Sequence, residues 1–194
     1  MKTKTGLFFG SFNPIHIGHL AIANYLAEFT DLDQVWFIIS PQNPFKKKQT
    51  LLADYHRYAL AERAIDDDYS KLKVSNIEFG LPQPSYTVNT LAHLEEKYPS
   101  HEFVLIMGSD NLKTLHKWKN AEHILEHYRI YVYPRKGSRG GELMNHPSVR
   151  IVDAPLMEVS SSFIREAIGA KKNVRYMLPQ TVAEYIREMH FYER

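Results

Sequence analysis

The chain has 194 residues, 44% hydrophobic and 24% charged, and its 24 basic and 22 acidic residues leave a formal net charge of +2. This length suits one domain with a sizeable core, residues 1–194, and the near balance of charge argues against a broad nucleic-acid-binding surface. Cysteine is absent, which excludes disulfides and thiol catalysis, and no apolar run reads as a signal peptide or a membrane span. We therefore expect a cytoplasmic protein that binds neither nucleic acid nor membrane, and the composition leaves the oligomeric state open.

The first stretch of the chain has the pattern of a strand, a loop and a helix. An apolar run over residues 7–9 ends at Gly10, the pair Asn13-Pro14 adds a turn signal, and from about Ile17 the apolar residues follow helical spacing. The first turn of such a helix has backbone N–H groups without partners and carries partial positive charge. The loop before the helix is therefore expected to favour a phosphate.

Two histidines stand three residues apart at the start of this helix. If His16 and His19 both occupy the first turn, their rings face one side and can donate hydrogen bonds to phosphate oxygens. Gly10 and Gly18 have no Cβ, which lets a bulky anion approach the backbone. A lone histidine would more often cap or pack against the helix end, but the combination favours a phosphate site.

Strand and helix patterns alternate along the rest of the chain. Strands are predicted at 34–39, 72–77, 103–107, 128–134 and 149–152, and helices at 52–65, from Ser85 or Thr87 to about 98, at 160–169 and from about 180 onward. This alternation predicts an α/β fold, a Rossmann-like doubly wound parallel sheet with helices on both faces and a small C-terminal helical portion.

Polar residues follow two of these strands at the edge where such sheets bind ligands. Residues 40–50 hold two prolines and three lysines, and these lysines face either solvent or an anionic substrate. Asp110 comes soon after the strand at 103–107, where its carboxylate can accept hydrogen bonds from a ribose, cap the next helix, or do both. The loop at 135–141 combines three basic residues with three glycines, which is typical of a mobile surface loop, and we assign it no catalytic role.

Two further segments carry residues suited to a nucleotide. Trp118 has polar neighbours, which suits a partly exposed ring that stacks on a flat ligand. The serines at 160–162 begin an amphipathic helix that Gly169 can end, with Arg165 about one turn in. A capped surface helix explains the serines but does not require the arginine.

Two of these segments together resemble a known superfamily. Residues 10–19, Gly-Ser-Phe-Asn-Pro-x-His-x-Gly-His, resemble the signature of the nucleotidyltransferases that share the His-x-Gly-His motif, whose fold is related to that of class I aminoacyl-tRNA synthetases. Residues 160–165 resemble the second signature, Ser-Ser-Thr-x-x-Arg, with Ser162 where threonine is common. Asn13 stands where the family more often has aspartate, which removes a charge and keeps the turn chemistry. The resemblance implies nucleotidyl transfer from a nucleoside triphosphate with release of pyrophosphate.

Other segments are similar to the bacterial nicotinate mononucleotide adenylyltransferases. These are the Ser-Tyr-Thr run at 85–87, Trp118, and a Leu-Pro pair before a closing Tyr-Ile helix. The similarity implies adenylyl transfer from ATP to nicotinate mononucleotide, giving nicotinate adenine dinucleotide and pyrophosphate for NAD biosynthesis. The acceptor-binding residues that it implies are Asn43, Lys46, Tyr86, Thr87 and Trp118.

The resemblance also implies roles for residues around ATP. His16 and His19 would hold the α and β phosphates, and Arg165 with the serines would hold the β and γ phosphates. The implied ATP-binding residues are Gly10, Ser11, Phe12, Gly18, Gly108, Asp110, Ser160, Ser161 and Ser162. Mg²⁺ is expected to arrive with ATP and to keep mostly water ligands, so no metal ligands are expected from protein side chains.

Three other functions were weighed from the sequence, and it leaves the first two open. The acceptor of an adenylyltransferase could instead be nicotinamide mononucleotide or phosphopantetheine, although Trp118 with Tyr86 and Thr87 favours a pyridine nucleotide. A catalytically silent nucleotide-binding module would have the same fold. An RNA-binding relative of the synthetases is disfavoured, because the chain has neither an anticodon domain nor a strongly basic composition.

Overall fold

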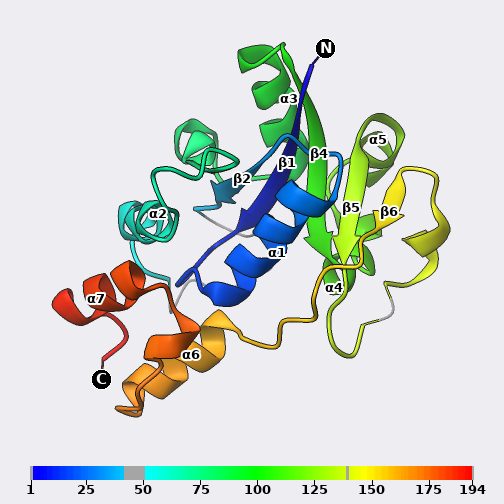
Figure 1. The fold of residues 1–194 in the computed structure, drawn as a ribbon. Coiled ribbons are helices and arrows are strands. Elements are labelled where there is room, and N and C mark those ends of the chain that lie inside the picture. Colours follow the sequence, from blue (N-terminus) through cyan, green and yellow to red (C-terminus); the bar gives the residue numbers. More distant parts are fainter. Residues whose placement is uncertain (1, 42–50, 139, 194) are drawn as a thin grey trace.

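A parallel β-sheet forms the middle layer of the molecule (Figure 1). The computed structural model describes residues 2–41, 51–138 and 140–193, and within these ranges the sheet has six strands in the order β3-β2-β1-β4-β5-β6. The strands are β1 (Thr3–Gly10), β2 (Gln34–Ile39), β3 (Leu72–Ser75), β4 (His101–Gly108), β5 (Arg129–Tyr133) and β6 (Val149–Ile151). Every neighbouring pair is parallel. This order is that of the doubly wound dinucleotide-binding sheets, so the predicted Rossmann-like class is confirmed.

The central strands are apolar on both faces because helices cover both faces of the sheet. In β1, Leu7 and Phe8 point to opposite sides and belong to two separate hydrophobic clusters. Each stands opposite an aromatic residue of β2, Leu7 opposite Trp36 and Phe8 opposite Phe37. Parallel pairing of such continuous apolar strands fixes β1 at the centre of the sheet.

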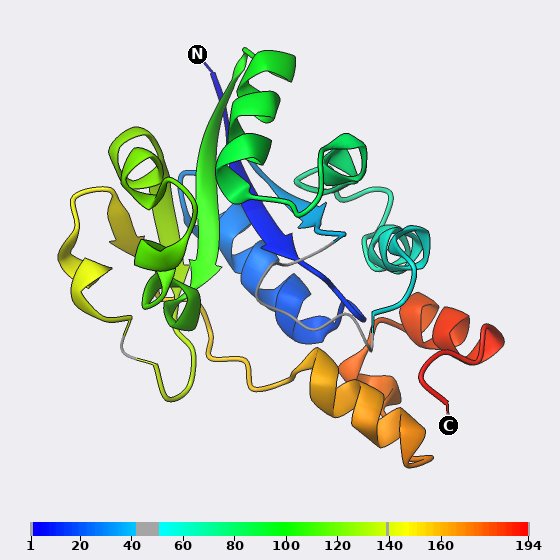
Figure 2. The same ribbon diagram turned by 180° about the vertical axis from the view of Figure 1, so that it is seen from behind.

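Helices pack on both faces of the sheet, as the two views show (Figures 1 and 2). The cluster that contains Phe8 includes buried residues of α1 (Ile17–Phe29), α2 (Asp54–Arg63), α6 (Ser161–Gly169) and α7 (Gln180–Glu188). The cluster that contains Leu7 includes buried residues of α3 (Thr87–Lys97), the short α4 (Ser109–Leu112) and α5 (Ala121–His127). Short 3₁₀ turns lie at Ile77–Gly80, Leu115–Lys117, Glu142–Asn145 and Arg175–Met177.

The last two helices, α6 and α7, form the predicted C-terminal helical portion beside α2 (Figure 1). The side chains of His56 in α2 and Tyr185 in α7 are hydrogen-bonded, with 3.1 Å between Nδ1 and the hydroxyl oxygen. The guanidinium of Arg63 lies 4.1 Å from the centre of the Tyr185 ring. These contacts attach α7, near the end of the chain, to α2.

Several predicted boundaries shift by a few residues. The helix expected at 52–65 is Asp54–Arg63, and the strand expected to reach residue 77 ends at Ser75 because a 3₁₀ turn follows. Neither Ser85 nor Thr87 caps α3, since Tyr86 is its N-cap and no side chain closes that end. Helix ends depend on local turn geometry, which residue spacing predicts poorly.

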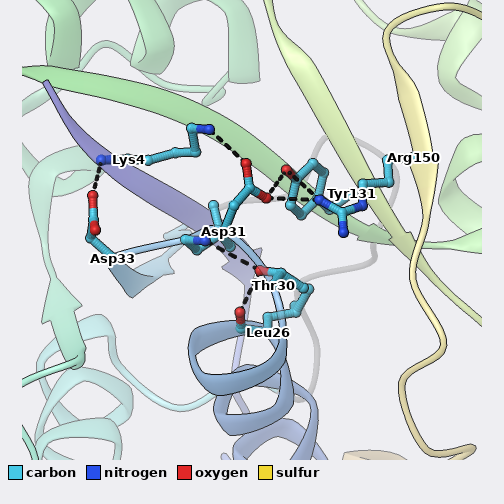
Figure 3. A network of polar contacts seen from close by, with 8 residues as sticks. Lys4, Leu26, Thr30, Asp31, Asp33, Tyr131 and Arg150 are labelled. Carbon is cyan, nitrogen blue, oxygen red and sulfur yellow. Dashed lines mark hydrogen bonds and ion pairs between the residues drawn. The ribbon is translucent and has the colours of Figure 1, made fainter. Parts of the chain in front are cut away.

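A network of polar contacts ties β1 to β5 and β6 across the sheet (Figure 3). The carboxylate of Asp31, just after α1, accepts hydrogen bonds from Lys4 at 2.6 Å, from the hydroxyl of Tyr131 at 2.5 Å and from Arg150 at 2.8 Å. The Lys4 ammonium and the Tyr131 hydroxyl hold the pKa of Asp31 well below its usual range. A single carboxylate thus joins the central strand β1 to β5 and to the edge strand β6.

Replacing this carboxylate by an amide, Asp31→Asn, is expected to lower the free energy of unfolding by about 1 kcal/mol at pH 7, since the network is partly exposed. A folded-state pKa below the unfolded one means that the contribution is present above about pH 4 and is lost as the pH falls through the folded pKa. Urea unfolding of wild type and variant at pH 7 and pH 2 measures this. Asp67→Asn, at an exposed position, is the control, and a difference that stays the same at pH 2 would contradict the assignment.

Candidate functional site

A cleft of about 360 Å³ opens at the carboxyl ends of β1 and β4, the two strands at which the direction of winding reverses. Ligands of open parallel sheets bind at this switch point. The cleft brings together residues from the two predicted signatures and from the end of β4. The predicted site residues that line it are Gly10, Ser11, Phe12, His16, His19, Asp110, Ser160, Ser161, Ser162 and Arg165.

The loop between β1 and α1, residues 11–16, is held by a buried arginine from α2. Arg57 has no exposed surface, and its NH1 group donates to the carbonyl oxygens of Ser11 at 2.7 Å and Ser40 at 2.9 Å. Its Nε donates to the carbonyl of Leu52 at 3.1 Å, and NH2 pairs with the carboxylate of Asp54. One guanidinium therefore fixes the chain just after β1, just after β2 and just before α2.

The helix α6 holds the same loop from the other side. Arg165 donates to the carbonyl of Asn13 at 2.7 Å, and Ser161 Oγ donates to the carbonyl of Pro14 at 2.8 Å. Ser160 is the N-cap, and its hydroxyl accepts from the backbone N–H of Phe163 at 3.2 Å, so the predicted serine cap is present. The two predicted signatures, which lie about 150 residues apart in sequence, are in direct contact.

Both histidines stand at the start of α1 and face each other. His16 is the N-cap, His19 lies three residues further, and their rings stack with centroids 3.7 Å apart. The backbone N–H of His16 donates to Nδ1 of His19 at 3.3 Å, which fixes the His19 ring. The predicted placement of both rings on one side of the first turn is confirmed by this geometry.

The ring of His16 is buried and electrically neutral in the free protein. Burial, followed by the nearby positive charge of Arg135, lowers the pKa of His16 to about 4. Its Nδ1 is buried and finds no hydrogen-bond partner among the described residues. A buried polar atom without a partner costs free energy, and a ligand in the cleft can supply the missing contact. Gly18 makes room for this ring, because a Cβ at that position would lie 3.1 Å from Nδ1 of His16.

Backbone strain accompanies the close packing of the loop. Phe12 adopts a positive φ of 43°, which is uncommon for a residue with a side chain. Its ring is buried against Phe8, and a Cβ on Gly10 would lie 2.9 Å from the Phe12 ring. Gly10 is thus needed for packing under the loop, in addition to the anion access that the sequence predicted.

The end of β4 contributes a second group of residues to the cleft. Asp110 lies inside the four-residue α4, whose N-cap is Gly108, so the predicted capping role of Asp110 is wrong. A Cβ on Gly108 would overlap the Asp110 carboxylate and lie 2.8 Å from Arg135. Arg135, the first residue of the loop to which the sequence assigned no catalytic role, lines the cleft, with its Nε 3.9 Å from Oδ1 of Asp110.

Three of the predicted acceptor residues, Tyr86, Thr87 and Trp118, do not line this cleft. Tyr86 and Thr87 begin α3, and Trp118 packs partly buried on the α3 side of the sheet. The ammonium of Lys119 lies 4.7 Å from the centre of the Tyr86 ring, which brings the Trp118 segment and the start of α3 together. Asn43 and Lys46 lie outside the described residues.

Comparison with known proteins agrees with the two motifs. A family model described as cytidylyltransferase-like matches residues 7–167. A probable nicotinate-nucleotide adenylyltransferase of Flavobacterium johnsoniae is 57% identical over 193 residues, covering 98% of this chain and all of that protein. One of Bacteroides fragilis is 49% identical and covers 95% of this chain and 92% of that protein. The chain belongs to the cytidylyltransferase-like family and, within it, to the nicotinate-nucleotide adenylyltransferases.

Solved structures of lower identity share the fold of this adenylyltransferase family member. The nicotinic acid mononucleotide adenylyltransferase of Plasmodium falciparum, complexed with NaAD, superimposes with a TM-score of 0.80 at 18% identity, covering 98% of this chain and 97% of that one. A putative nicotinate-nucleotide adenylyltransferase of Vibrio parahaemolyticus gives 0.72 at 23% identity, covering 96% and 99%. The fold of this chain thus recurs in proteins with little sequence identity to it.

Two arginines at the site, Arg57 and Arg135, were not predicted from the sequence. Arg57 sits in an amphipathic helix, and nothing in its spacing marks it as buried. Arg135 follows directly after a predicted strand. Asp110 was selected for its place after a strand, and the same criterion would have identified Arg135 as a candidate site residue. Within the described residues, no group of three or more His, Asp or Glu side chains forms a metal site, and no helix is long and apolar enough to cross a membrane.

Substituting the buried arginine, Arg57→Met, is expected to lower the free energy of unfolding by about 3 kcal/mol or more. Methionine fills similar space but leaves the carbonyls of Ser11, Ser40 and Leu52 without a donor. Urea unfolding measures the change, and Arg187→Met, at an exposed position of α7, is the control. A loss below 1 kcal/mol, or one equal to that of the control, would contradict the role given to Arg57.

Proposed function

We propose that this protein transfers the adenylyl group of ATP to nicotinate mononucleotide, giving nicotinate adenine dinucleotide and pyrophosphate. The observation that carries the proposal is the single cleft in which His16, His19, Arg165 and the serine-capped start of α6 meet. Relatives about half identical over nearly the whole chain are named for the same reaction. The reaction belongs to NAD biosynthesis.

The chemistry requires alignment and charge stabilisation. An oxygen of the acceptor's 5′-phosphate attacks the α-phosphorus of ATP, a new P–O bond forms, and the bond to the β-phosphate oxygen breaks, so that pyrophosphate leaves with the electron pair. A phosphate monoester is already ionised near neutral pH, so the step needs no protein nucleophile and no strong base. Catalysis then comes from positioning and from stabilising the charge on the leaving group.

The two histidines are proposed to bind the α and β phosphates. Because burial lowers the pKa of His16 to about 4, its imidazole would act near neutral pH as a hydrogen-bond donor without net charge. His19, fixed by the backbone of His16, presents its ring beside it. Gly10, Ser11, Phe12 and Gly18 shape the loop on which the phosphates would rest.

The start of α6 is proposed to bind the β and γ phosphates. Ser160, Ser161 and Ser162 line the cleft at the start of α6, where the first backbone N–H groups of the helix have no intrahelical acceptor, and Arg165 adds the positive charge that a leaving pyrophosphate needs. Arg165 already donates to Asn13, so its guanidinium is fixed before a ligand arrives. Gly108 and Asp110 would hold the ribose at the other side of the cleft.

The acceptor is proposed to bind along the start of α3, with its pyridine ring against Trp118. Tyr86 and Thr87 stand at the N-terminus of α3, where backbone donors can meet a carboxylate, and the ammonium of Lys119 lies over the Tyr86 ring. This positive charge favours the carboxylate of nicotinate mononucleotide over the uncharged carboxamide of nicotinamide mononucleotide. Asn43 and Lys46 complete the proposed acceptor set.

The residues of the cleft fit a magnesium ion that arrives with ATP. Among the described residues lining the cleft, Asp110 is the one carboxylate, which suits an ion held mainly by phosphate oxygens and water. When bound, Mg²⁺ would neutralise part of the triphosphate charge. The proposed protein contribution is to hold the phosphates from the sides through His16, His19 and Arg165.

Pyrophosphate release by purified protein with Mg-ATP tests the proposal. Nicotinate mononucleotide is expected to support turnover well above nicotinamide mononucleotide and phosphopantetheine. Removing one phosphate donor, His19→Ala, is expected to lower kcat roughly a hundredfold. The exposed His123→Ala is the control. Turnover unaffected by His19→Ala would contradict the phosphate role, and absence of turnover with every acceptor would favour a nucleotide-binding module.

The acceptor site has its own test in Trp118→Ala. Losing offset stacking on the pyridine ring, worth about 1 kcal/mol, is expected to raise KM for nicotinate mononucleotide roughly fivefold to tenfold. The KM for ATP is expected to change less than twofold and serves as the internal control. Equal changes in both KM values would place Trp118 away from the acceptor.

A further inference from the structure

The last residues of the chain return to the loop that begins the cleft. The hydroxyl of Tyr192 donates a hydrogen bond of 2.8 Å to Oδ1 of Asn13, across 179 residues of sequence. Asn13 is only 2% exposed, and the same oxygen accepts from the backbone N–H of Leu52 at 3.2 Å. The Asn13 side chain therefore joins the β1–α1 loop, the segment just before α2 and the C-terminal tail.

The tail reaches this position through an unusual backbone path. After α7 ends at Glu188, His190 and Tyr192 both adopt positive φ angles, 53° and 65°. Residues with a side chain rarely adopt this conformation, and it persists only where surrounding contacts hold it. Phe191 between them is buried, and its N–H donates to the carbonyl of Ile186 at 3.0 Å. The path turns the Tyr192 ring back toward the cleft.

The Tyr192 hydroxyl lies in the field of the two arginines that hold the loop. Burial raises the pKa of Tyr192, while the positive charges of Arg165 and Arg57 oppose that rise. The phenol is therefore protonated at neutral pH and acts as a donor. Arg57 binds the carbonyl of Ser11 and Arg165 that of Asn13, so Tyr192 completes a set of donors around one short loop.

Docking of the C-terminal helix does not depend on this hydroxyl. Val182, Ile186 and Phe191 are buried, and Tyr185 and Thr181 make their own hydrogen bonds to α2. Removing the Tyr192 hydroxyl alone leaves these contacts in place. It removes the hydrogen bond from Tyr192 to the Asn13 side chain.

We propose that Tyr192 is a positioning residue for adenylyl transfer, because its hydrogen bond to Asn13 fixes the loop that carries His16 and that receives Arg165. The inference rests on the proposed function. Tyr192 does not line the cleft, so it acts through Asn13 and the loop. Small displacements of groups that align reacting atoms lower the rate of the chemical step more than they weaken substrate binding.

The test compares Tyr192→Phe with Tyr176→Phe. Phenylalanine keeps the ring and removes the hydroxyl, and Tyr176 is 89% exposed in the same C-terminal portion. Tyr192→Phe is expected to lower kcat about tenfold with less than a twofold change in KM for ATP, and Tyr176→Phe to change neither. Rates are measured well below both melting temperatures, so that a loss of stability does not enter the ratio.

A second measurement is independent of activity. Hydrogen exchange of the free protein is expected to be several-fold faster in Tyr192→Phe at residues 11–16 and at Leu52, with α3 unchanged. A kcat within twofold of wild type would overturn the proposal whatever the exchange rates, and unaltered exchange at these positions would overturn it as well. An equal loss of kcat in Tyr176→Phe would also overturn it. Wild-type protein without pyrophosphate release would overturn the proposed function, and the exchange comparison would still test the contact.

Discussion

The site depends on how the carbonyl groups of one short loop are satisfied. Between β1 and α1 the chain leaves regular structure, so its carbonyls need donors from elsewhere. Arg57 from α2 and Arg165 from α6 supply two of them, at Ser11 and at Asn13, and Ser161 supplies a third at Pro14. Because these donors come from distant parts of the chain, the loop takes its shape only when the whole molecule is folded. The start of α1, with its two histidines, is positioned by the same contacts.

The proposed binding of phosphates in the cleft does not require a large positive charge. His16 is neutral because it is buried, and the chain as a whole carries a formal net charge of only +2. In the proposed binding mode, attraction to phosphate comes from helix N-termini and aligned N–H donors at α1 and α6, together with the cations Arg165 and Arg135 that line the cleft. Dipoles fixed in advance stabilise developing charge without reorganising during the reaction. Arg165 both holds the β1–α1 loop and lines the cleft.

The sequence predicted the fold and the centre of the site because both rest on local patterns. Buried parallel strands such as Gln34–Ile39 are continuous apolar runs, and the two signatures are short segments with fixed spacing. The sequence did not reveal contacts whose partners lie far apart, such as Arg57 with three carbonyls or Tyr192 with Asn13. Their residue types are ordinary, and only the folded chain brings the partners together. Helix ends were also misplaced, as at Tyr86, where no side chain provides the cap.

The central claim is that the triphosphate lies between the paired histidines and the start of α6. A crystal structure with a non-hydrolysable ATP analogue and Mg²⁺ tests it most directly. We expect the α and β phosphates within hydrogen-bonding distance of His16 and His19, and the γ phosphate at Ser160 to Ser162 beside Arg165. Phosphates bound away from these groups, for example in the groove between α6 and α7, would contradict it.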